Sequence, residues 1–330
     1  MNDMAYVQIG GNVKTGTSLL SALLDGHPEV VGYPGETGMT GYLFPIISDP
    51  LLSLACKVER ICRIRFRGHT QPPAPGITWE ELERAFCLFC ADIANDPFEL
   101  HRALLCAFYQ LADPDALLRA RFWVDKSPFA HLFAEEIFGA YPAAKFLQMI
   151  RDPKDNYASI ASKHQRKRVK TRRKMELSLY RYRVWSAQAF WYAQRNSREF
   201  GPDRYMVIRF EDLCQRPREV VPRICEFLGI EETPALYMPT RAGLPYGGNN
   251  FEGKSFDGIY AGNVGNWRSR MPEYYGRVME CQRLDLLTGF GYPTDFRPGQ
   301  RARAARASAL DPACAPRQAS GDQVLARADL

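Results

Sequence analysis

The chain has 330 residues, with 43 Lys and Arg against 37 Asp and Glu, so its formal net charge is +6. Hydrophobic residues at 46% and charged residues at 24% are ordinary globular values, which exclude disorder for most of the chain. No run of eighteen apolar residues occurs and no basic segment precedes an apolar leader, so neither a membrane span nor a signal peptide is expected. The nine cysteines are scattered, which favours reduced thiols and a cytoplasmic location.

Two segments carry much of the positive charge. Residues 163–174 hold eight Lys and Arg and no acidic residue, and residues 297–330 hold six Arg and three Asp. The second segment is rich in Ala, Arg, Ser and Asp, which predicts a flexible tail over 297–330. The remainder, residues 1–296, is expected to form one domain, with a helical insertion at about 50–115.

Short apolar strands alternate with amphipathic helices along the domain. The predicted strands are Ala5–Gly10, Glu29–Gly32, Arg121–Val124, Lys145–Ile150 and Tyr205–Phe210. The predicted helices are Thr17–Asp25, Trp79–Ala94, Phe98–Leu111, Phe129–Tyr141, a helix starting at Pro153, Met175–Phe200 and Pro217–Leu228. This alternation predicts an α/β fold with a central parallel sheet that is covered on both faces.

The first strand runs into a glycine-containing loop, Gly10-Gly-Asn-Val-Lys-Thr-Gly-Thr-Ser18, and a helix follows. Such a loop points backbone N–H groups and a helix N-terminus at an anion. Against the nucleotide-binding pattern G-x-x-x-x-G-K-[ST], Gly11, Gly16 and Ser18 match, but Thr17 stands where the lysine belongs. The lysine is instead inside the loop, at Lys14. The loop therefore predicts a phosphate site in a P-loop-like three-layer sandwich.

Four segments resemble sulfotransferases that use 3′-phosphoadenosine-5′-phosphosulfate (PAPS). The loop K-T-G-T resembles the 5′-phosphosulfate loop of heparan-type carbohydrate enzymes, and the following L-L-D-G-H-P-E-V resembles tyrosylprotein and bacterial members. The other three segments are Phe146–Ser159, which resembles the 3′-phosphate segment, Val207–Leu213, which resembles R-Y-E-D-L, and Gly262–Arg268, which resembles the late V-G-x-W loop.

The resemblance implies a set of donor-binding residues in this sequence. They are Lys14, Thr15, Gly16, Thr17, Ser18, Arg151, Ser159, Phe210 and Arg268. Arg151 follows a strand and offers a planar fork that suits a phosphate. Cytosolic relatives carry Arg-Lys-Gly before the late loop, but this chain has Tyr260, Ala261 and Gly262 there. Arg268 or the basic segment is the candidate replacement.

Sulfuryl transfer requires a base for the acceptor and cations for the developing charge. Glu36 follows the second predicted strand and is the preferred base, because tyrosylprotein and heparan-type enzymes have a catalytic Glu there. His101 and His131 are the alternatives, since other relatives use a histidine. Lys14 and Lys126 are the candidate catalytic cations. Lys126 lies in Asp-Lys-Ser-Pro, which resembles the family segment (E/D)-K-(S/T)-P.

The resemblance thus predicts in-line transfer of a sulfuryl group from PAPS to an acceptor hydroxyl, with no metal required. A carbohydrate acceptor is expected first, and a tyrosine or a small alcohol next. The basic segment 163–174 is either a solvated helix extension or a surface for an acidic glycan or peptide; no nucleic acid is expected. A P-loop nucleotide kinase and a non-catalytic polyanion-binding protein are the alternatives outside this class.

Overall fold

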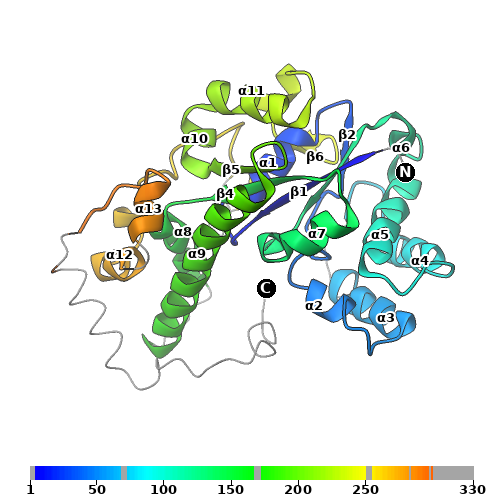
Figure 1. Ribbon diagram of the computed structural model, residues 1–330, viewed down its shortest axis with the longest axis horizontal. Helices are drawn as coiled ribbons and strands as arrows, with labels where there is room; N and C mark the ends of the chain where they lie inside the picture. Colours follow the sequence, from blue (N-terminus) through cyan, green and yellow to red (C-terminus); the bar gives the residue numbers. More distant parts are fainter. Residues whose placement is uncertain are drawn as a thin grey trace. The chain divides into compact units, whose positions relative to one another are not determined.

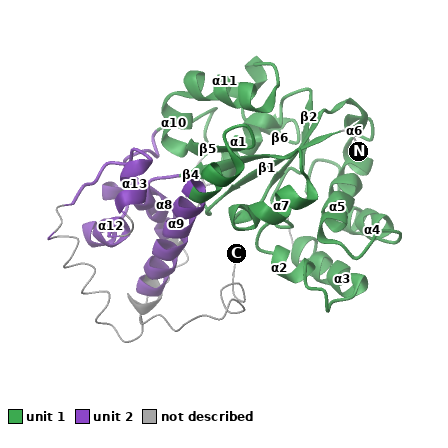
Figure 2. Cartoon of the chain, viewed as in Figure 1, with its two compact units in different colours: residues 1–150, 195–249, 254–261 green, residues 151–194, 250–253, 262–330 purple. Residues whose placement is uncertain are grey.

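The computed structural model describes residues 4–67, 73–166, 172–249, 255–281, 284–296 and 299 (Figure 1). The chain divides into two compact units, which Figure 2 colours separately. The first unit comprises residues 1–150, 195–249 and 254–261, and the second comprises 151–194, 250–253 and 262–330. Within the described ranges, no helix is both long enough and apolar enough to cross a membrane. The eight cysteines in these ranges are all free thiols.

A five-stranded parallel sheet forms the centre of the first unit. Its strand order is β2-β3-β1-β4-β5. The strands are β1 (Ala5–Gly11), β2 (Val30–Gly32), β3 (Phe122–Lys126), β4 (Lys145–Ile150) and β5 (Tyr205–Arg209). Since all five strands run in the same direction, the segments that follow them emerge at one edge of the sheet. This confirms the predicted α/β class with a central parallel sheet.

One face of the sheet carries large aromatic side chains. Tyr6, Trp123, Phe146 and Tyr205 project from four neighbouring strands into a single hydrophobic core. Helices packed on this core are α2 (Phe44–Ile47), α3 (Leu54–Arg65), α4 (Trp79–Phe89), α5 (Pro97–Ala112) and α7 (Ala134–Ala140). The short helix α6 (Ala116–Arg119) and the 3-10 turn η1 (Ala130–Phe133) connect them to the strands.

The alternate residues of the strands belong to the opposite face. Val7, Ile9 and Val124 are buried there, and α1 (Thr17–Leu24) contacts both β1 and β3. The first unit also contains α10 (Phe210–Gln215), α11 (Pro217–Leu228), η2 (Pro234–Tyr237) and an antiparallel pair formed by β6 (Thr240–Arg241) and β7 (Leu244–Pro245). Helices therefore cover both faces of this sheet (Figure 1).

The second unit is built on helices. It contains α8 (Pro153–Arg166), most of α9 (Arg172–Phe200), η3 (Trp267–Ser269), α12 (Glu273–Glu280) and α13 (Leu284–Gly289). The ammonium of Lys154, which is 3% exposed, lies 3.1 Å from a carboxylate oxygen of Glu280 and 2.6 Å from one of Asp295. Glu280 also accepts bonds from the backbone N–H groups of Asp295 and Phe296. This ion cluster attaches the segment around residue 295 to α8 and α12.

Local sequence signals explain several helix ends. Thr78 and Glu81 form a capping box at the start of α4, and the side chain of Asp96 accepts two backbone N–H bonds at the start of α5. Gly229, at φ 75°, ends α11 in the left-handed conformation, and the bounds of α11 agree with the predicted helix Pro217–Leu228.

Several element boundaries differ from the predictions. The helix predicted over Phe129–Tyr141 is broken, because Phe129 has a left-handed φ of 67° and a 3-10 turn precedes α7. The helix predicted over Trp79–Ala94 ends at Phe89, and Phe210 begins α10 instead of ending β5. The side chains of the basic segment 163–174 are outside the part of the chain that the structure describes. The predicted tail 297–330 is also outside that part, with the exception of residue 299.

Candidate active site

The phosphate loop connects β1 to α1, as predicted. Gly16 is the N-cap of α1 and has a φ of 100°. No side chain caps this helix, so no capping side chain occupies the first N–H groups of α1. Lys14 adopts a left-handed φ of 62°. The amide nitrogen Nδ2 of Asn12, a residue 1% exposed, is buried without a hydrogen-bond partner. A loop with these donors fits an anionic phosphosulfate group.

Gly16 cannot be replaced without a clash. A Cβ built on Gly16 would lie 2.4 Å from Cδ2 of Phe210, so the aromatic ring of Phe210 packs directly on the loop. This places Phe210 beside the loop, where the family resemblance expects an aromatic residue near the nucleotide.

We expect Gly16→Ala to unfold the loop locally, because the new methyl group meets Phe210 and the positive φ disfavours any side chain. The loss should be about 1–3 kcal/mol of stability, with a matching loss of affinity for adenosine 3′,5′-bisphosphate. Thermal unfolding and calorimetry measure the two effects. Gly139→Ala in α7 is the control, since nothing lies within 4 Å of its Cβ position; it should be neutral or slightly stabilising. Equal behaviour of the two variants would contradict the expectation.

Residues 246–249 approach the loop from a distant part of the sequence. Lys14 Nζ donates to the backbone oxygen of Asn249 at 2.5 Å, and Asn249 Nδ2 donates to Ser18 Oγ at 3.1 Å. Burial raises the pKa of Tyr246 to about 12, and a hydrogen bond to Ser18 opposes this rise. Two residues predicted to bind the donor are therefore already engaged by this segment.

Glu36 and Lys126 form an ion pair at the carboxyl edge of the sheet. Lys126 Nζ lies 2.8 Å from Glu36 Oε1, and the side chains are 5% and 31% exposed, so the carboxylate is the more accessible partner. Burial would raise the pKa of Glu36, but Lys126, with Arg65 and Lys14 further off, outweighs it and lowers that pKa. Burial lowers the pKa of Lys126, and Glu36 opposes this. Glu36 is therefore ionised at neutral pH.

A buried carboxylate holds the Glu36 loop to β3. Asp125, 1% exposed, accepts hydrogen bonds from Thr37 Oγ1 at 2.7 Å, Thr40 Oγ1 at 2.8 Å and Ser127 Oγ at 2.8 Å. Since Thr37 is adjacent to Glu36 and Asp125 is adjacent to Lys126, these bonds fix the backbone on both sides of the ion pair. No motif in the sequence predicted this network.

The two candidate histidines are buried in the first unit. His101 is 1% exposed, and its Nε2 lies 3.6 Å from Asp125 Oδ2. Burial would raise the pKa of Asp125, but His101 and the threonine hydroxyls hold it well below its usual range. His131 is 1% exposed, and burial lowers its pKa to about 3. Neither histidine is among the residues that line the pocket described next.

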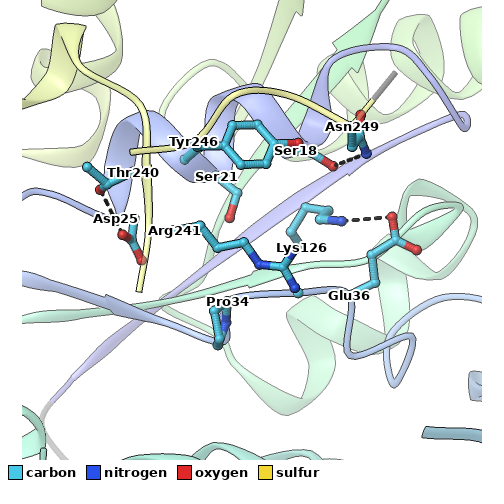
Figure 3. Close-up of a pocket in the computed structure, with 12 residues that line it drawn as sticks. Ser18, Ser21, Asp25, Pro34, Glu36, Lys126, Thr240, Arg241, Tyr246 and Asn249 are labelled. Atoms are coloured by element: carbon cyan, nitrogen blue, oxygen red, sulfur yellow. Dashed lines mark hydrogen bonds and ion pairs between the residues drawn. The ribbon is translucent and has the colours of Figure 1, made fainter. Parts of the chain in front are cut away.

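A pocket of about 220 Å³ lies against α1 and contains the ion pair (Figure 3). All of its lining residues belong to the first unit. They are Ser18, Ser21, Ala22, Asp25, Pro34, Gly35, Glu36, Lys126, Thr240, Arg241, Tyr246 and Asn249. The pocket thus joins the end of the phosphate loop to the candidate base and cation. The described part of the chain holds no group of three metal-ligating side chains.

Three predicted donor-binding residues belong to the second unit. Arg151 is 5% exposed and donates from Nη2 to the backbone oxygen of Asn263 at 2.9 Å. Ser159 lies on α8 and is 9% exposed. Arg268 is 56% exposed at its side chain, stacks on Trp267 and lies 3.2 Å from Asp295. The late loop is thereby joined to Arg151, whereas Arg268 is engaged by an acidic residue.

Sequence analysis predicted only Ser18, Glu36 and Lys126 among the residues that line the pocket. Among those it missed are Asp25, Arg241, Tyr246 and Asn249. The only local signal was the turn at Ala242-Gly243, which brings β6 and β7 together. No motif marks Tyr246 or Asn249, because their place near the loop depends on tertiary folding.

Together these features define an α/β protein with a P-loop-like fold. A family model described as "Sulfotransferase family" matches residues 7–234. The chain belongs to the sulfotransferase family.

Two curated relatives are protein-tyrosine sulfotransferases. The Drosophila melanogaster enzyme is 28% identical over 236 residues, which cover 71% of this chain and 40% of that protein. Protein-tyrosine sulfotransferase 2 of Gallus gallus is 26% identical over 231 residues, which cover 69% of this chain and 52% of that protein. The chain therefore matches about half or less of the length of these relatives.

Solved structures show the same fold. The sulfotransferase domain of the Synechococcus PCC 7002 olefin synthase has a TM-score of 0.53 and 21% identity, covering 88% of this chain and 96% of that one. The sulfotransferase domain of the curacin biosynthetic pathway has a TM-score of 0.52 and 18% identity, covering 88% and 98%. At these identities the likeness concerns the fold.

Proposed function

We propose that the chain transfers a sulfuryl group in line from PAPS to an acceptor hydroxyl. The observation that carries the proposal is the pocket, which contains the end of the phosphate loop at Ser18 together with the Glu36–Lys126 pair. Family membership supports the reaction type. The bound donor supplies the sulfuryl group and a good leaving group.

Each residue of the site has a distinct role in this proposal. Glu36, ionised and accessible from the pocket, accepts the proton of the acceptor hydroxyl. Lys126 holds Glu36 in place and supplies positive charge near the sulfuryl oxygens. Lys14 and the N–H groups at the start of α1 hold the phosphosulfate.

A separate set of residues is proposed for the 3′-phosphate of the donor. Arg151 and Ser159 are proposed to bind it through the guanidinium fork and the hydroxyl. Arg268 is the less suitable ligand, because Asp295 already neutralises it. The Asp155 carboxylate accepts the N–H groups of Gly265 at 2.5 Å and Trp267 at 2.9 Å, which fixes the late loop at the start of α8.

Two acceptor classes have support. The K-T-G-T loop and a glutamate in place of a histidine favour a carbohydrate hydroxyl. The curated relatives favour a tyrosine phenol, since both are protein-tyrosine sulfotransferases. A turnover assay that offers a tyrosine peptide and an oligosaccharide in competition distinguishes them by the product that acquires the sulfuryl group.

Calorimetry with adenosine 3′,5′-bisphosphate tests the donor. We expect binding in the absence of a divalent metal. Tight binding of ATP with Mg²⁺ and none of the bisphosphate would support the kinase alternative and overturn the proposal. A polyanion-binding protein would instead lose its function when residues 163–174 are deleted and keep it in Lys14→Met.

The ion pair predicts how the rate depends on pH. As pH falls, kcat/KM declines through the pKa of Glu36, which lies below the ordinary value of about 4.3. In Lys126→Gln the counter-charge is gone while burial remains, so we expect this acid limb to move upward by about 1 pH unit or more. Lys145→Gln, away from the pocket, is the control. An acid limb that stays in place in Lys126→Gln would argue against Glu36 as the titrating group.

A further inference from the structure

A small hairpin forms one wall of the pocket. Strands β6 and β7 are joined by Ala242 and Gly243, whose φ values of 50° and 73° are both left-handed. The carboxylate of Asp25, at the end of α1, accepts bonds from Thr240 Oγ1 at 2.7 Å, Gly243 N at 3.1 Å and Ala242 N at 3.3 Å. Asp25 therefore fixes the hairpin to α1, and both of its oxygens are used in doing so.

The hairpin places Arg241 in the pocket. Figure 3 shows the guanidinium extending from the hairpin into the space near Pro34. A Cβ built on Gly35 would lie 3.6 Å from Arg241 Nη2, so the guanidinium rests on the residue that precedes Glu36. The charge of Arg241 also opposes the rise in pKa that burial causes at Tyr246, which lines the same pocket.

Arg241 differs from the other cation of the pocket. Lys126 is neutralised by Glu36, whereas no acidic side chain in the described ranges lies within ion-pair distance of Arg241. Asp25, the other acid of the pocket, is occupied by the hairpin. Arg241 is an exposed residue, and its backbone is held in the hairpin that Asp25 fixes to α1, so the guanidinium is carried on a defined support beside the candidate base.

The size of the pocket limits what can reach Arg241. A volume of about 220 Å³ is smaller than the roughly 300–1,000 Å³ of sites for whole drug-sized ligands. It can enclose about one ring or one residue of an acceptor, while the rest of the acceptor lies outside it. A negative group that pairs with Arg241 inside the pocket would belong to the same ring or residue as the reacting hydroxyl, or to its immediate neighbour.

We propose that Arg241 is an acceptor-binding residue that selects acceptors carrying an anionic group close to the hydroxyl. This inference rests on the proposed function, because it assumes that the pocket at Glu36 receives the acceptor. The guanidinium binds the anionic group by a forked, charge-assisted hydrogen bond and thereby directs the hydroxyl toward Glu36. Asp25 acts as a positioning residue, since both of its carboxylate oxygens are bonded to the hairpin.

Two matched pairs of probes test the proposal. One is 4-hydroxyphenylacetate with its amide, and the other is methyl glucuronide with methyl glucoside. Dissociation constants are measured by calorimetry on the full chain, with and without saturating adenosine 3′,5′-bisphosphate. The variants are Arg241→Gln, which removes the charge, and Arg241→Lys, which keeps it. Arg119→Gln, which loses an exposed arginine on α6, is the control.

We expect the wild type to bind at least one acidic probe about 10-fold more tightly than its neutral partner. Arg241→Gln should lose this preference, Arg241→Lys should keep part of it, and Arg119→Gln should keep all of it. Equal binding of acid and neutral probes by the wild type, an unchanged preference in Arg241→Gln, or no binding of any probe would overturn the proposal. Failure of the bisphosphate to bind would instead contradict the proposed function, and the probes can still be compared on the unloaded protein.

Discussion

Replacing Glu36 by Gln should lower kcat by about 10²–10⁴-fold. The amide cannot accept the proton of the acceptor hydroxyl. The substitution also removes the negative charge that pairs with Lys126. Because burial lowers the pKa of Lys126, part of the positive charge on its ammonium group is then lost as well. Glu36→Gln therefore affects both the base and the cation, which is why its effect should be among the largest in the molecule.

Binding of adenosine 3′,5′-bisphosphate separates a chemical defect from a folding defect. Glu36→Gln should bind it as the wild type does, because Glu36 is not among the proposed donor ligands. Glu219→Gln, an exposed acid on α11, is the matched control and should keep full turnover. Full turnover by Glu36→Gln with normal donor binding would exclude Glu36 as the base.

Replacing Lys14 by Met should lower kcat by about 10²–10³-fold, because one charged donor to the developing negative charge is removed. Affinity for the bisphosphate should fall as well, since the loop loses its cation. Met has a similar length and the same backbone preferences, so the left-handed φ of 62° imposes no new cost. Steady-state kinetics and calorimetry measure the two losses.

Lys14→Arg and Lys145→Met are the matched variants for this prediction. The arginine keeps the charge and should restore part of the rate. Lys145 lies on β4, donates to the backbone oxygen of Asp203 and is not among the pocket residues, so Lys145→Met should be close to wild type. A Lys14→Met enzyme with an unchanged kcat would show that the loop cation has no part in the transition state.

The sheet and the phosphate loop were predictable because their signals are local. Lys145–Ile150 is a continuous apolar run, and its bounds agree with β4. Gly16 is both the motif glycine and the residue whose positive φ the turn requires. In the strand and in the loop, the hydrophobic pattern and the turn residues lie within about ten residues of one another. The local sequence is therefore enough to predict both structures.

The acceptor side of the pocket was not predictable in the same way. Glu36 and Lys126 were each expected at a strand end, but their pairing at 2.8 Å depends on β2 and β3 being neighbours in the sheet. Arg241 and Asn249 reach the pocket through a hairpin and a loop more than 100 residues away from Lys126. Such contacts depend on topology, which a single sequence specifies only indirectly.

Strand β3 ends in two charged residues that are neighbours in sequence and serve opposite faces of the sheet. Asp125 faces the buried threonines, and Lys126 faces the pocket. A shift of one residue in the register of β3 would exchange a structural carboxylate for a reactive ammonium, so the strand cannot tolerate an insertion or deletion here. Arg241 lies on the separate β6–β7 pair, outside this sheet, so a substitution of its side chain leaves the register of β3 and the positions of Asp125 and Lys126 unchanged.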